Sequence, residues 1–255
     1  MGNQSPDRRP LADLTASYDA AADSWDTGPG PIYEPLARAL VAAGRAAIAA
    51  GARQVVAADL SLAMLRRHTI KATDPTGAPA CHPVAADATA LPFRDGSFAL
   101  ILAAFCLNHL PRLDTALADL HRVSPALAAS TFAPGWTHPA KDAVDKTARS
   151  FGYRPPPWYT TLAPGTRAGD PAELAAAATT AGFTRVQISV ITVPVPLTTP
   201  AELAAWRLGL AHYAPFLRAL DAPDRAKVYR AAEQAVAATG ATAPLTVEMT
   251  VLTAS

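Results

Sequence analysis

The sequence predicts an α/β fold with a doubly wound, mostly parallel sheet, and three observations lead to this prediction. Short apolar runs alternate with amphipathic helical segments along the first half of the chain, as they do in βαβ units. The continuous apolar run "FALILAAFCL" (98–107) is typical of a parallel strand that is covered on both faces. Two long β-branched runs near the C-terminus, 184–197 and 243–254, predict an antiparallel pair that closes the sheet at its edge.

The individual elements follow from hydrophobic periodicity. Apolar residues at helical spacing predict a long helix from Tyr33 to Ala50, with Gly44 as the only breaker,. "RQVVAADLS" predicts a buried strand, after which Ser61 caps the next helix,. The later elements are, in order, a strand at 81–87, the strand at 98–107, a helix at 113–123, a strand at 126–136 and a helix at 171–183.

Composition excludes several classes of protein. Half of the 255 residues are apolar and 17% are charged, which is a globular composition. A net charge of +1 gives no basic field for nucleic acid. Without an apolar run of about 18 residues we expect no membrane span. Cys81 and Cys106 form neither a metal-ligand set nor a disulfide framework, so we expect no metal and a cytoplasmic location.

The chain has no internal repeat and no linker that divides it. We therefore expect one domain over residues 1–255. Within it, residues 138–180 contain the proline-rich aromatic segment "GYRPPPWY". This segment predicts a lid or insert over a substrate, although a partner surface and a plain connection are alternatives.

Several motifs in order resemble the class I S-adenosylmethionine (SAM) dependent methyltransferases of small-molecule type, the type 11-like group. They are "YDAAADSWD", "VVAADLSLAML", "VAADATALPFRDGSFALILAAFCLNHL", "ALADLHRV" and "AELAAAATTAGFTRVQIS". The resemblance spans nearly the whole chain. It implies a Rossmann-like sheet with an antiparallel final strand, and a ligand at the carboxyl ends of the strands.

The resemblance also implies roles for individual residues. Asp59 corresponds to the acid that binds the ribose, and Asp87, next to Ala88, to the acid that binds the adenine amino group. Asn108 and His109 correspond to the floor of the substrate pocket, and Tyr18 to an aromatic lid. Further candidates for contact with substrate are the aromatic residues near the entry motif and in the proline-rich segment: Trp25, Tyr153, Trp158 and Tyr159.

One departure from the family matters most. The family's first motif is an apolar strand followed by a Gly-x-Gly loop that approaches the methionine half of SAM. No such strand or loop is evident between Tyr33 and Arg53, where Gly44 stands as a remnant. Each lost or unpaired hydrogen-bonding group costs about 1–3 kcal/mol. We therefore expect the first strand and loop to be deleted and SAM binding to be weak, and no cofactor is favoured.

The same residues also suit purely structural roles. Asp59 and Asp87 also suit helix caps at strand ends. His109 also suits a core or rim position, and Tyr18 and Trp25 also suit packing anchors.

Three functions remain at this stage. The first is a non-methylating enzyme, a cyclase or eliminase, that closes a ring by intramolecular displacement, for instance by an amine. Its candidate bases are the side chains of Asp19, Asp23, Asp59, Asp87 and His109,. The second is a non-catalytic partner subunit in a heteromeric or homodimeric complex. The third is a genuine SAM-dependent methyltransferase. In the first and third, the substrate is a small molecule of natural-product biosynthesis.

Overall fold

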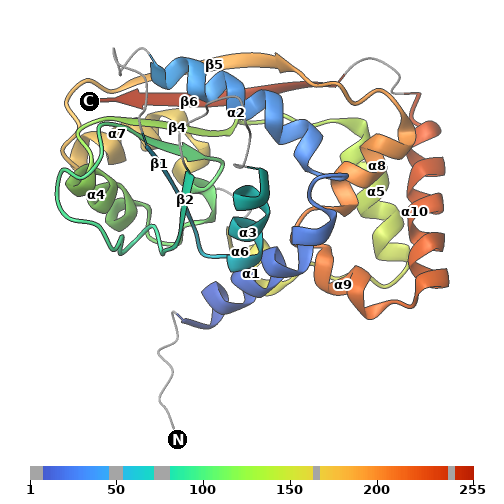
Figure 1. Cartoon of the computed structure of the whole chain (residues 1–255). Helices are drawn as coiled ribbons and strands as arrows, with labels where there is room; N and C mark the ends of the chain where they lie inside the picture. The colour runs from blue at the N-terminus through green and yellow to red at the C-terminus, as the bar shows by residue number, and fades with distance from the viewer. Residues whose placement is uncertain (1–7, 46–53, 72–80, 163–166, 241–244) are drawn as a thin grey trace, which may run out of the picture. The chain divides into compact units, whose positions relative to one another are not determined.

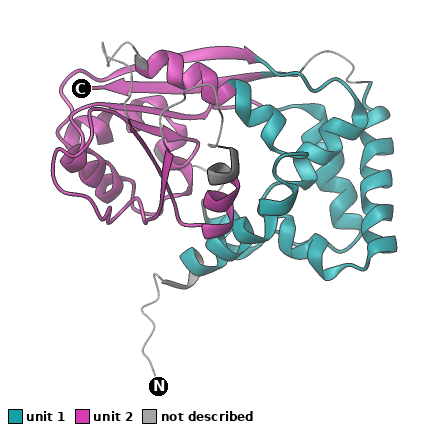
Figure 2. Ribbon diagram, viewed as in Figure 1, with its two compact units in different colours: residues 1–35, 137–161, 194–246 teal, residues 36–136, 162–193, 247–255 magenta. Residues whose placement is uncertain are grey.

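The computed structural model describes residues 8–45, 54–71, 81–162, 167–240 and 245–255 (Figure 1). They form a mixed α/β protein, so the predicted fold class is confirmed. The chain divides into two compact units, each built from three stretches of sequence (Figure 2). Unit 1 contains residues 1–35, 137–161 and 194–246, and unit 2 contains residues 36–136, 162–193 and 247–255. The single domain over 1–255 and the lid at 138–180 stay predictions.

The strands of unit 2 form two sheets. They are β1 (Val55–Asp59), β2 (Cys81–Ala85), β3 (Ile101–Ala104), β4 (Leu127–Phe132), β5 (Gln187–Pro194) and β6 (Thr246–Ala254). β1 and β2 pair in parallel, and the second sheet has the order β3-β4-β6-β5. β4 is parallel to β3 and antiparallel to β6. The antiparallel final strand is confirmed, but it lies inside the sheet, and β5 forms the edge.

No backbone ladder joins β1 to β3 in the residues that the structure describes. Residues 46–53, which precede β1, lie outside those residues, so the deletion of the first strand stays a prediction. β3 is shorter than the apolar run 98–107, and Leu102 is 43% exposed. The expected burial on both faces is therefore wrong for this strand. Before β3 the chain pairs with the end of a helix instead, where the amide of Phe98 donates to the carbonyl of Val123.

The helices of unit 2 cover its sheets. They are the second part of α2 (Gly30–Arg45), α3 (Leu62–Lys71), α4 (Leu113–Val123), α7 (Pro171–Thr180) and the short turns η2 (Leu107–His109) and η3 (Arg167–Gly169). α2 begins three residues earlier than predicted, because proline is well tolerated in the first helical turn and Pro31 stands there. Ser61 caps α3 as predicted, accepting from the amide of Met64. α4 and α7 bury leucines against β3, β4 and β6.

An arginine at the end of α4 fixes the loop that follows β2. Arg122 donates from Nη1 and Nη2 to the carbonyls of Phe93 and Leu91, at 2.7 and 3.0 Å. Its Nε bonds Asp119, which also accepts from the amide of Leu91. Asp119 is therefore a loop anchor and not a solvated residue of the helix face, because two donors need its carboxylate.

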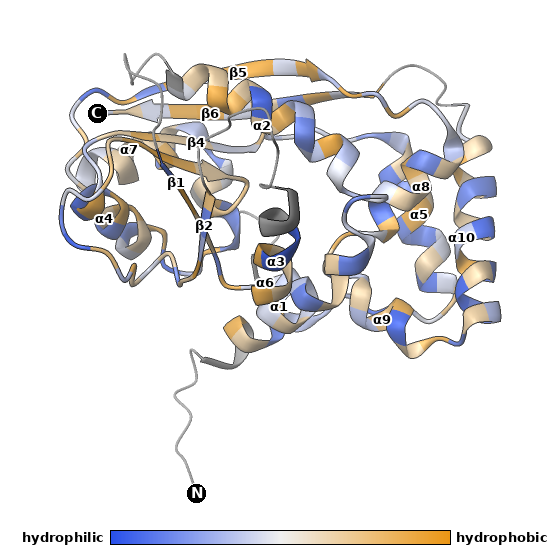
Figure 3. Cartoon of the chain, viewed as in Figure 1, coloured by the Kyte–Doolittle hydropathy of each residue, from blue (hydrophilic) through white to orange (hydrophobic). Residues whose placement is uncertain are grey.

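Unit 1 is helical. Its elements are α1 (Arg8–Ala21), η1 (Ala22–Ser24), the start of α2, α5 (Pro139–Ser150), α6 (Pro157–Leu162), α8 (Pro200–Leu208), α9 (Ala214–Ala219) and α10 (Ala222–Ala237). α5, α8 and α10 pack on one another, and hydrophilic colours mark much of α10 (Figure 3). Thr199 and Glu202 form a capping box at α8,. Trp206, Tyr213 and Val228 are buried in this unit.

We predict that Gly182→Ala destabilises the protein. Gly182 has φ +113°, and an added Cβ would lie 2.7 Å from the His121 ring, so backbone strain and a clash act together. Gly135→Ala is the matched control, since Gly135 also has positive φ but nothing within 4 Å. In urea denaturation we expect Gly182→Ala to lose about 1–3 kcal/mol more than the control. Equal losses in the two variants would contradict the clash.

Candidate functional site

Asp59 and Asp87 lie at the carboxyl ends of the two parallel strands β1 and β2. Asp59 is in register with Ala85, and the amide of Ala86 donates to the carbonyl of Asp59 at 3.0 Å. Asp87 therefore follows directly beside the end of β1. This edge is where ligands bind in open α/β sheets.

Both carboxylates hold the turn that follows their strand. Asp59 Oδ1 accepts from the amide of Ser61 at 2.8 Å. Asp87 Oδ1 accepts from the amide and the hydroxyl of Thr89, at 2.8 and 2.7 Å. Among the described residues no hydrogen bond uses Oδ2 of Asp87, so this oxygen remains able to accept from a ligand. Asp87 can therefore cap the turn with Oδ1 and bind a ligand with Oδ2 at the same time.

The residues that follow β3 lie near the carboxylate of Asp59. Phe105 has φ +50°, a left-handed conformation that is uncommon for a bulky residue and is often found at functional sites. The next residue, Cys106, is half-buried, and its desolvation together with the negative charge of Asp59 raises the pKa of its thiol to about 12. Asp59 and Cys106 therefore lie close enough to interact, and the thiol stays protonated near neutral pH.

His109 and Asn108 form the turn after β3. Burial lowers the pKa of His109 to about 4, so the imidazole is neutral at pH 7 and is a weaker base than an exposed histidine. Nε2 of His109 lies 3.3 Å from Nδ2 of Asn108. In the tautomer that leaves Nε2 without a proton, the side-chain amide of Asn108 donates to it. Oδ1 of Asn108 is buried without a hydrogen-bond partner in the described part of the chain. Such an unpaired acceptor is rare in folded proteins.

The fit to SAM can be tested on these residues. On the adenosine side, the carboxylates of Asp59 and Asp87 provide acceptors. On the methionine side, the described residues before β1 form helix α2, and its Gly44 packs on the sheet. A Cβ on Gly44 would lie 2.9 Å from Leu102 and 3.2 Å from Leu100. This glycine therefore allows close packing of helix on sheet and does not form a cradle for an amino acid group.

The predicted aromatic residues lie in unit 1, where they form one cluster. The ring of Tyr18 lies 6.1 Å from that of Trp25 and 6.5 Å from that of Trp158, between centroids. Trp158 also meets Tyr159 edge to face at 5.8 Å, and its indole donates to Ser17. Tyr18, Trp25 and Tyr159 are partly exposed, so the cluster presents aromatic surface and is not only packing.

Two of the predicted acids, Asp19 and Asp23, also lie in unit 1. The side chain of Asp23 is 86% exposed and lies 3.5 Å from Arg218. Asp19 follows Tyr18 on α1 and is half-buried. Asp19 and Asp23 belong to unit 1, and Asp59, Asp87 and His109 belong to unit 2.

Sequence reasoning missed a buried polar cluster in unit 1. Arg207, 6% exposed, donates from Nε and Nη2 to the two carboxylate oxygens of Asp145, at 2.7 and 2.8 Å. Tyr213 donates its hydroxyl to the same carboxylate. The hydroxyl of Tyr153 lies 2.8 Å from Nδ1 of His212. An arginine inside the apolar stretch "ELAAWRLGLAHY" was the available signal, since buried arginine needs a partner.

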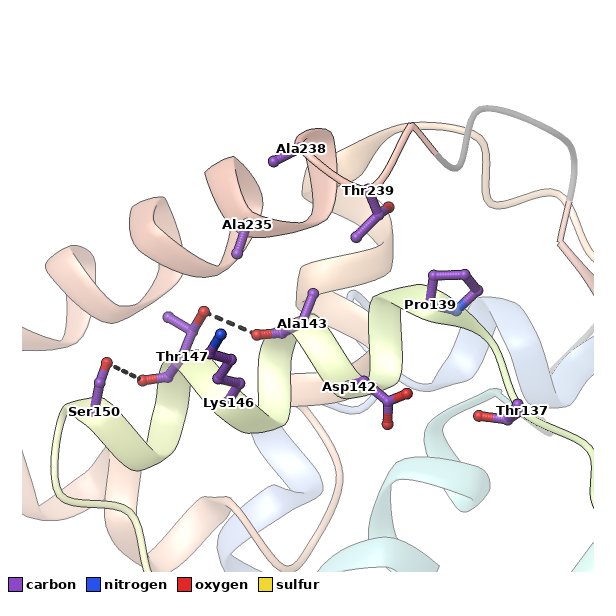
Figure 4. Close-up of a pocket in the computed structure, with 10 residues that line it drawn as sticks. All are labelled: Thr137, Pro139, Asp142, Ala143, Lys146, Thr147, Ser150, Ala235, Ala238 and Thr239. Carbon is purple, nitrogen blue, oxygen red and sulfur yellow. Dashed lines mark hydrogen bonds between the residues drawn. The ribbon is translucent and has the colours of Figure 1, made fainter.

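A groove of about 710 Å³ lies between α5 and α10 (Figure 4). Its hydroxyl groups are bonded to their own helix, as Thr147 to the carbonyl of Ala143 and Ser150 to that of Thr147. Ala143, Ala235 and Ala238 line much of the remainder. Asp142 and Lys146 also line the groove, so its lining is partly apolar and partly charged.

Part of the chain matches a known protein family. Residues 39–125 match the family model described as a methyltransferase domain, which is 87 of the 255 residues. The matched segment contains β1, β2, β3, α3 and α4. The chain is therefore similar to methyltransferase domains over these residues, and the described residues form a mixed α/β fold.

Solved structures with a similar arrangement are distant in sequence. The [4+2]-cyclase SpnF is 14% identical, with 84% of this chain and 68% of that chain covered and a TM-score of 0.44. YcgJ from Bacillus subtilis is 14% identical, with 79% and 82% covered and a TM-score of 0.46. Phosphoethanolamine N-methyltransferase 2 of Haemonchus contortus is 14% identical, with 79% and 43% covered and a TM-score of 0.40. No curated protein matches the chain.

The described ranges contain no helix that is long and apolar enough to cross a membrane. Nor do these ranges bring together three or more histidine, cysteine, aspartate or glutamate side chains that could hold a metal ion.

We predict that His109 makes the protein less stable at mildly acidic pH. Burial lowers its pKa from 6.5 to about 4, so between these values the unfolded chain binds a proton that the folded chain does not. Its contribution is complete above pH 6.5 and falls by about 1–3 kcal/mol as the pH drops toward 4. Urea denaturation at pH 7.5 and pH 5 should show a smaller loss in His109→Gln than in the wild type.

The exposed His82 of β2 provides the control for this experiment. His82→Gln should retain the wild-type dependence on pH. Burial and the charge of Lys141 also lower the pKa of His138, which acts in the same direction in every variant. Parallel stability curves for the wild type and His109→Gln would contradict the prediction.

Proposed function

We propose that this chain is a methyltransferase-fold enzyme of small-molecule biosynthesis that does not transfer a methyl group. The reaction is a cyclisation by intramolecular displacement, for instance ring closure by an amine. The observation that supports the proposal is the packing of Gly44. This glycine lies on helix α2, which the described residues continue to Arg45, and it packs on Leu100 and Leu102. The deletion of the glycine-rich loop is a prediction from the sequence, because residues 46–53 lie outside the described residues.

The chemistry needs a base and an ordered substrate. The amine nitrogen attacks the carbon that bears the leaving group, a C–N bond forms, and the leaving group departs with the electron pair of the broken bond. A carboxylate at the end of β1 or β2, Asp59 or Asp87, accepts the proton that the nitrogen loses. Holding nucleophile and electrophile in line contributes up to about 7–11 kcal/mol. His109, neutral because burial lowers its pKa to about 4, orients the substrate by hydrogen bonding.

Methyl transfer is the second candidate, and one oxygen favours it. Oδ2 of Asp87 accepts no hydrogen bond from the described residues and lies where the family binds the adenine amino group. SAM would supply an electrophilic methyl group at this site. This function needs a segment that replaces the glycine-rich loop.

A partner subunit is the third candidate, and the exposure of two strands favours it. Val55 of β1 and Leu102 of β3 are 38% and 43% exposed, although parallel strands are usually covered on both faces. A second chain, identical or related, could cover them. An isolated two-stranded sheet is only marginally stable, so a complex would also stabilise β1 and β2.

We predict that SAM and S-adenosylhomocysteine bind weakly or not at all. The sequence predicts that the loop for the methionine half of the cofactor is deleted, and each lost hydrogen bond costs about 1–3 kcal/mol. Calorimetric titration of the purified chain tests this directly. Binding in the micromolar range would favour methyl transfer over cyclisation.

We also predict that turnover of the pathway intermediate depends on Asp59 or Asp87. Asp59→Asn or Asp87→Asn should lower kcat by about 10²–10⁴-fold, the usual contribution of a general base. Asp95→Asn is the control, because Asp95 is 83% exposed and only pairs with Arg122. Full turnover in both variants would exclude these carboxylates as the base.

Gel filtration shows whether the purified chain is a monomer, and an assay shows whether it converts the substrate. A monomer that is active without another chain would exclude an obligatory partner. If activity appears only when a neighbouring gene is co-expressed, the partner function is supported.

A further inference from the structure

Arg207 of unit 1 is a cation held in a fixed orientation. Its side chain is 7% exposed, and Asp145 accepts from both Nε and Nη2. Such a two-point contact fixes the plane of the guanidinium group. Asp145 is fixed in turn by the hydroxyl of Tyr213, whose ring centroid lies 5.6 Å from the guanidinium carbon of Arg207.

One nitrogen of this guanidinium group is not used. In the described part of the chain, the hydrogen bonds of Arg207 start only from Nε and Nη2. Nη1 is also not one of the sealed side-chain atoms that lack a partner, so it contacts accessible space. A nearly buried cation therefore has two N–H groups that no acceptor of the described residues uses and that are not fully sealed from solvent. Unpaired donors in such surroundings are costly unless an acceptor binds there.

The charges near Arg207 favour a single negative charge as the acceptor. Lys141 lies one helical turn before Asp145 on α5, and its pKa is lowered by burial and then by the charge of Arg207. The charge of Asp145 acts on both Lys141 and Arg207, whereas the carboxylate of Asp142 is exposed and more strongly screened by water. A single negative charge is the acceptor that matches the unused donors of one guanidinium group.

Aromatic side chains lie near the guanidinium group of Arg207. The hydroxyl of Tyr159 lies 3.5 Å from Nη2 of Arg207. Tyr33 is also near, since the charge of Arg207 acts on its hydroxyl, whose pKa burial raises. The ring of Tyr33 stacks on Trp25 at 5.5 Å. A ligand bound to this guanidinium group would therefore have aromatic rings near it.

We propose that Arg207 Nη1 and the Tyr159 hydroxyl bind the carboxylate of a small organic acid, whose apolar part packs on the neighbouring rings. Two donors on different groups match the two oxygens of a carboxylate. A carboxylate carries the single charge that matches one guanidinium group, whereas a phosphate dianion carries two, so a carboxylate is the better ligand. The site goes beyond the function proposed above and is independent of it, because binding is measured without turnover.

Titration calorimetry of the whole chain tests the site with benzoate, acetate, inorganic phosphate and benzamide. Benzamide has the shape of benzoate without its charge. We expect saturable benzoate binding that is at least about tenfold tighter than benzamide binding, the effect of a hydrogen bond to a charged group. Equal binding of benzoate and benzamide, or no response to either carboxylate, overturns the proposal. Phosphate binding tighter than benzoate overturns the assignment to carboxylates.

Variants locate the binding on the protein. Tyr159→Phe should weaken benzoate about tenfold. The double variant Arg207→Gln with Asp145→Asn should abolish binding, and it avoids the unpaired buried carboxylate that Arg207→Gln alone would leave. Arg218→Gln is the control, because Arg218 is an exposed arginine of the same unit, and its benzoate affinity should stay within about twofold of the wild type.

Circular dichroism spectra and melting curves show whether each variant folds. Full benzoate affinity in a folded double variant overturns the proposal. If the double variant does not fold, the wild-type comparison of benzoate with benzamide and the Tyr159→Phe variant decide the question.

Discussion

Parallel strands place the residues that follow them at one edge of a sheet, and the site of unit 2 depends on this constraint. Asp59 ends β1 and Asp87 follows β2, and the bond from the amide of Ala86 to the carbonyl of Asp59 fixes their spacing. The charge of Asp59 also acts on Cys106 after β3. The ends of three strands are therefore close together, although no ladder joins β1 to β3 among the described residues.

Unit 1 depends on a different constraint, the cost of burying charge. A buried arginine has to keep its carboxylate, because removal of one partner leaves the other uncompensated, at about 3–5 kcal/mol. Arg207 on α8 and Asp145 on α5 thus hold two helices in one register. The aromatic rings around them are ordered by the same contacts, which gives the unit a preformed surface with both polar and apolar parts.

Much of the fold could be predicted from local sequence patterns. The helix at 113–123 matches α4 residue for residue, and Ser61 caps α3 as its position predicted. β3 could not be predicted as well, because its exposure depends on what lies beside it and not on its own apolar composition. The role of Asp119 could not be predicted for a similar reason, since its donors, Leu91 and Arg122, come together only after the loop has folded onto α4.

The sequence by itself determined the order of strands and helices and the two acids at strand ends, because hydrophobic period and capping are local properties. Only the tertiary structure decided that the strands form two sheets, that Gly44 packs on β3 and that Arg207 finds Asp145. These outcomes depend on contacts between residues far apart in the chain. Their free energies arise from burial and charge pairing in three dimensions, which no local pattern records.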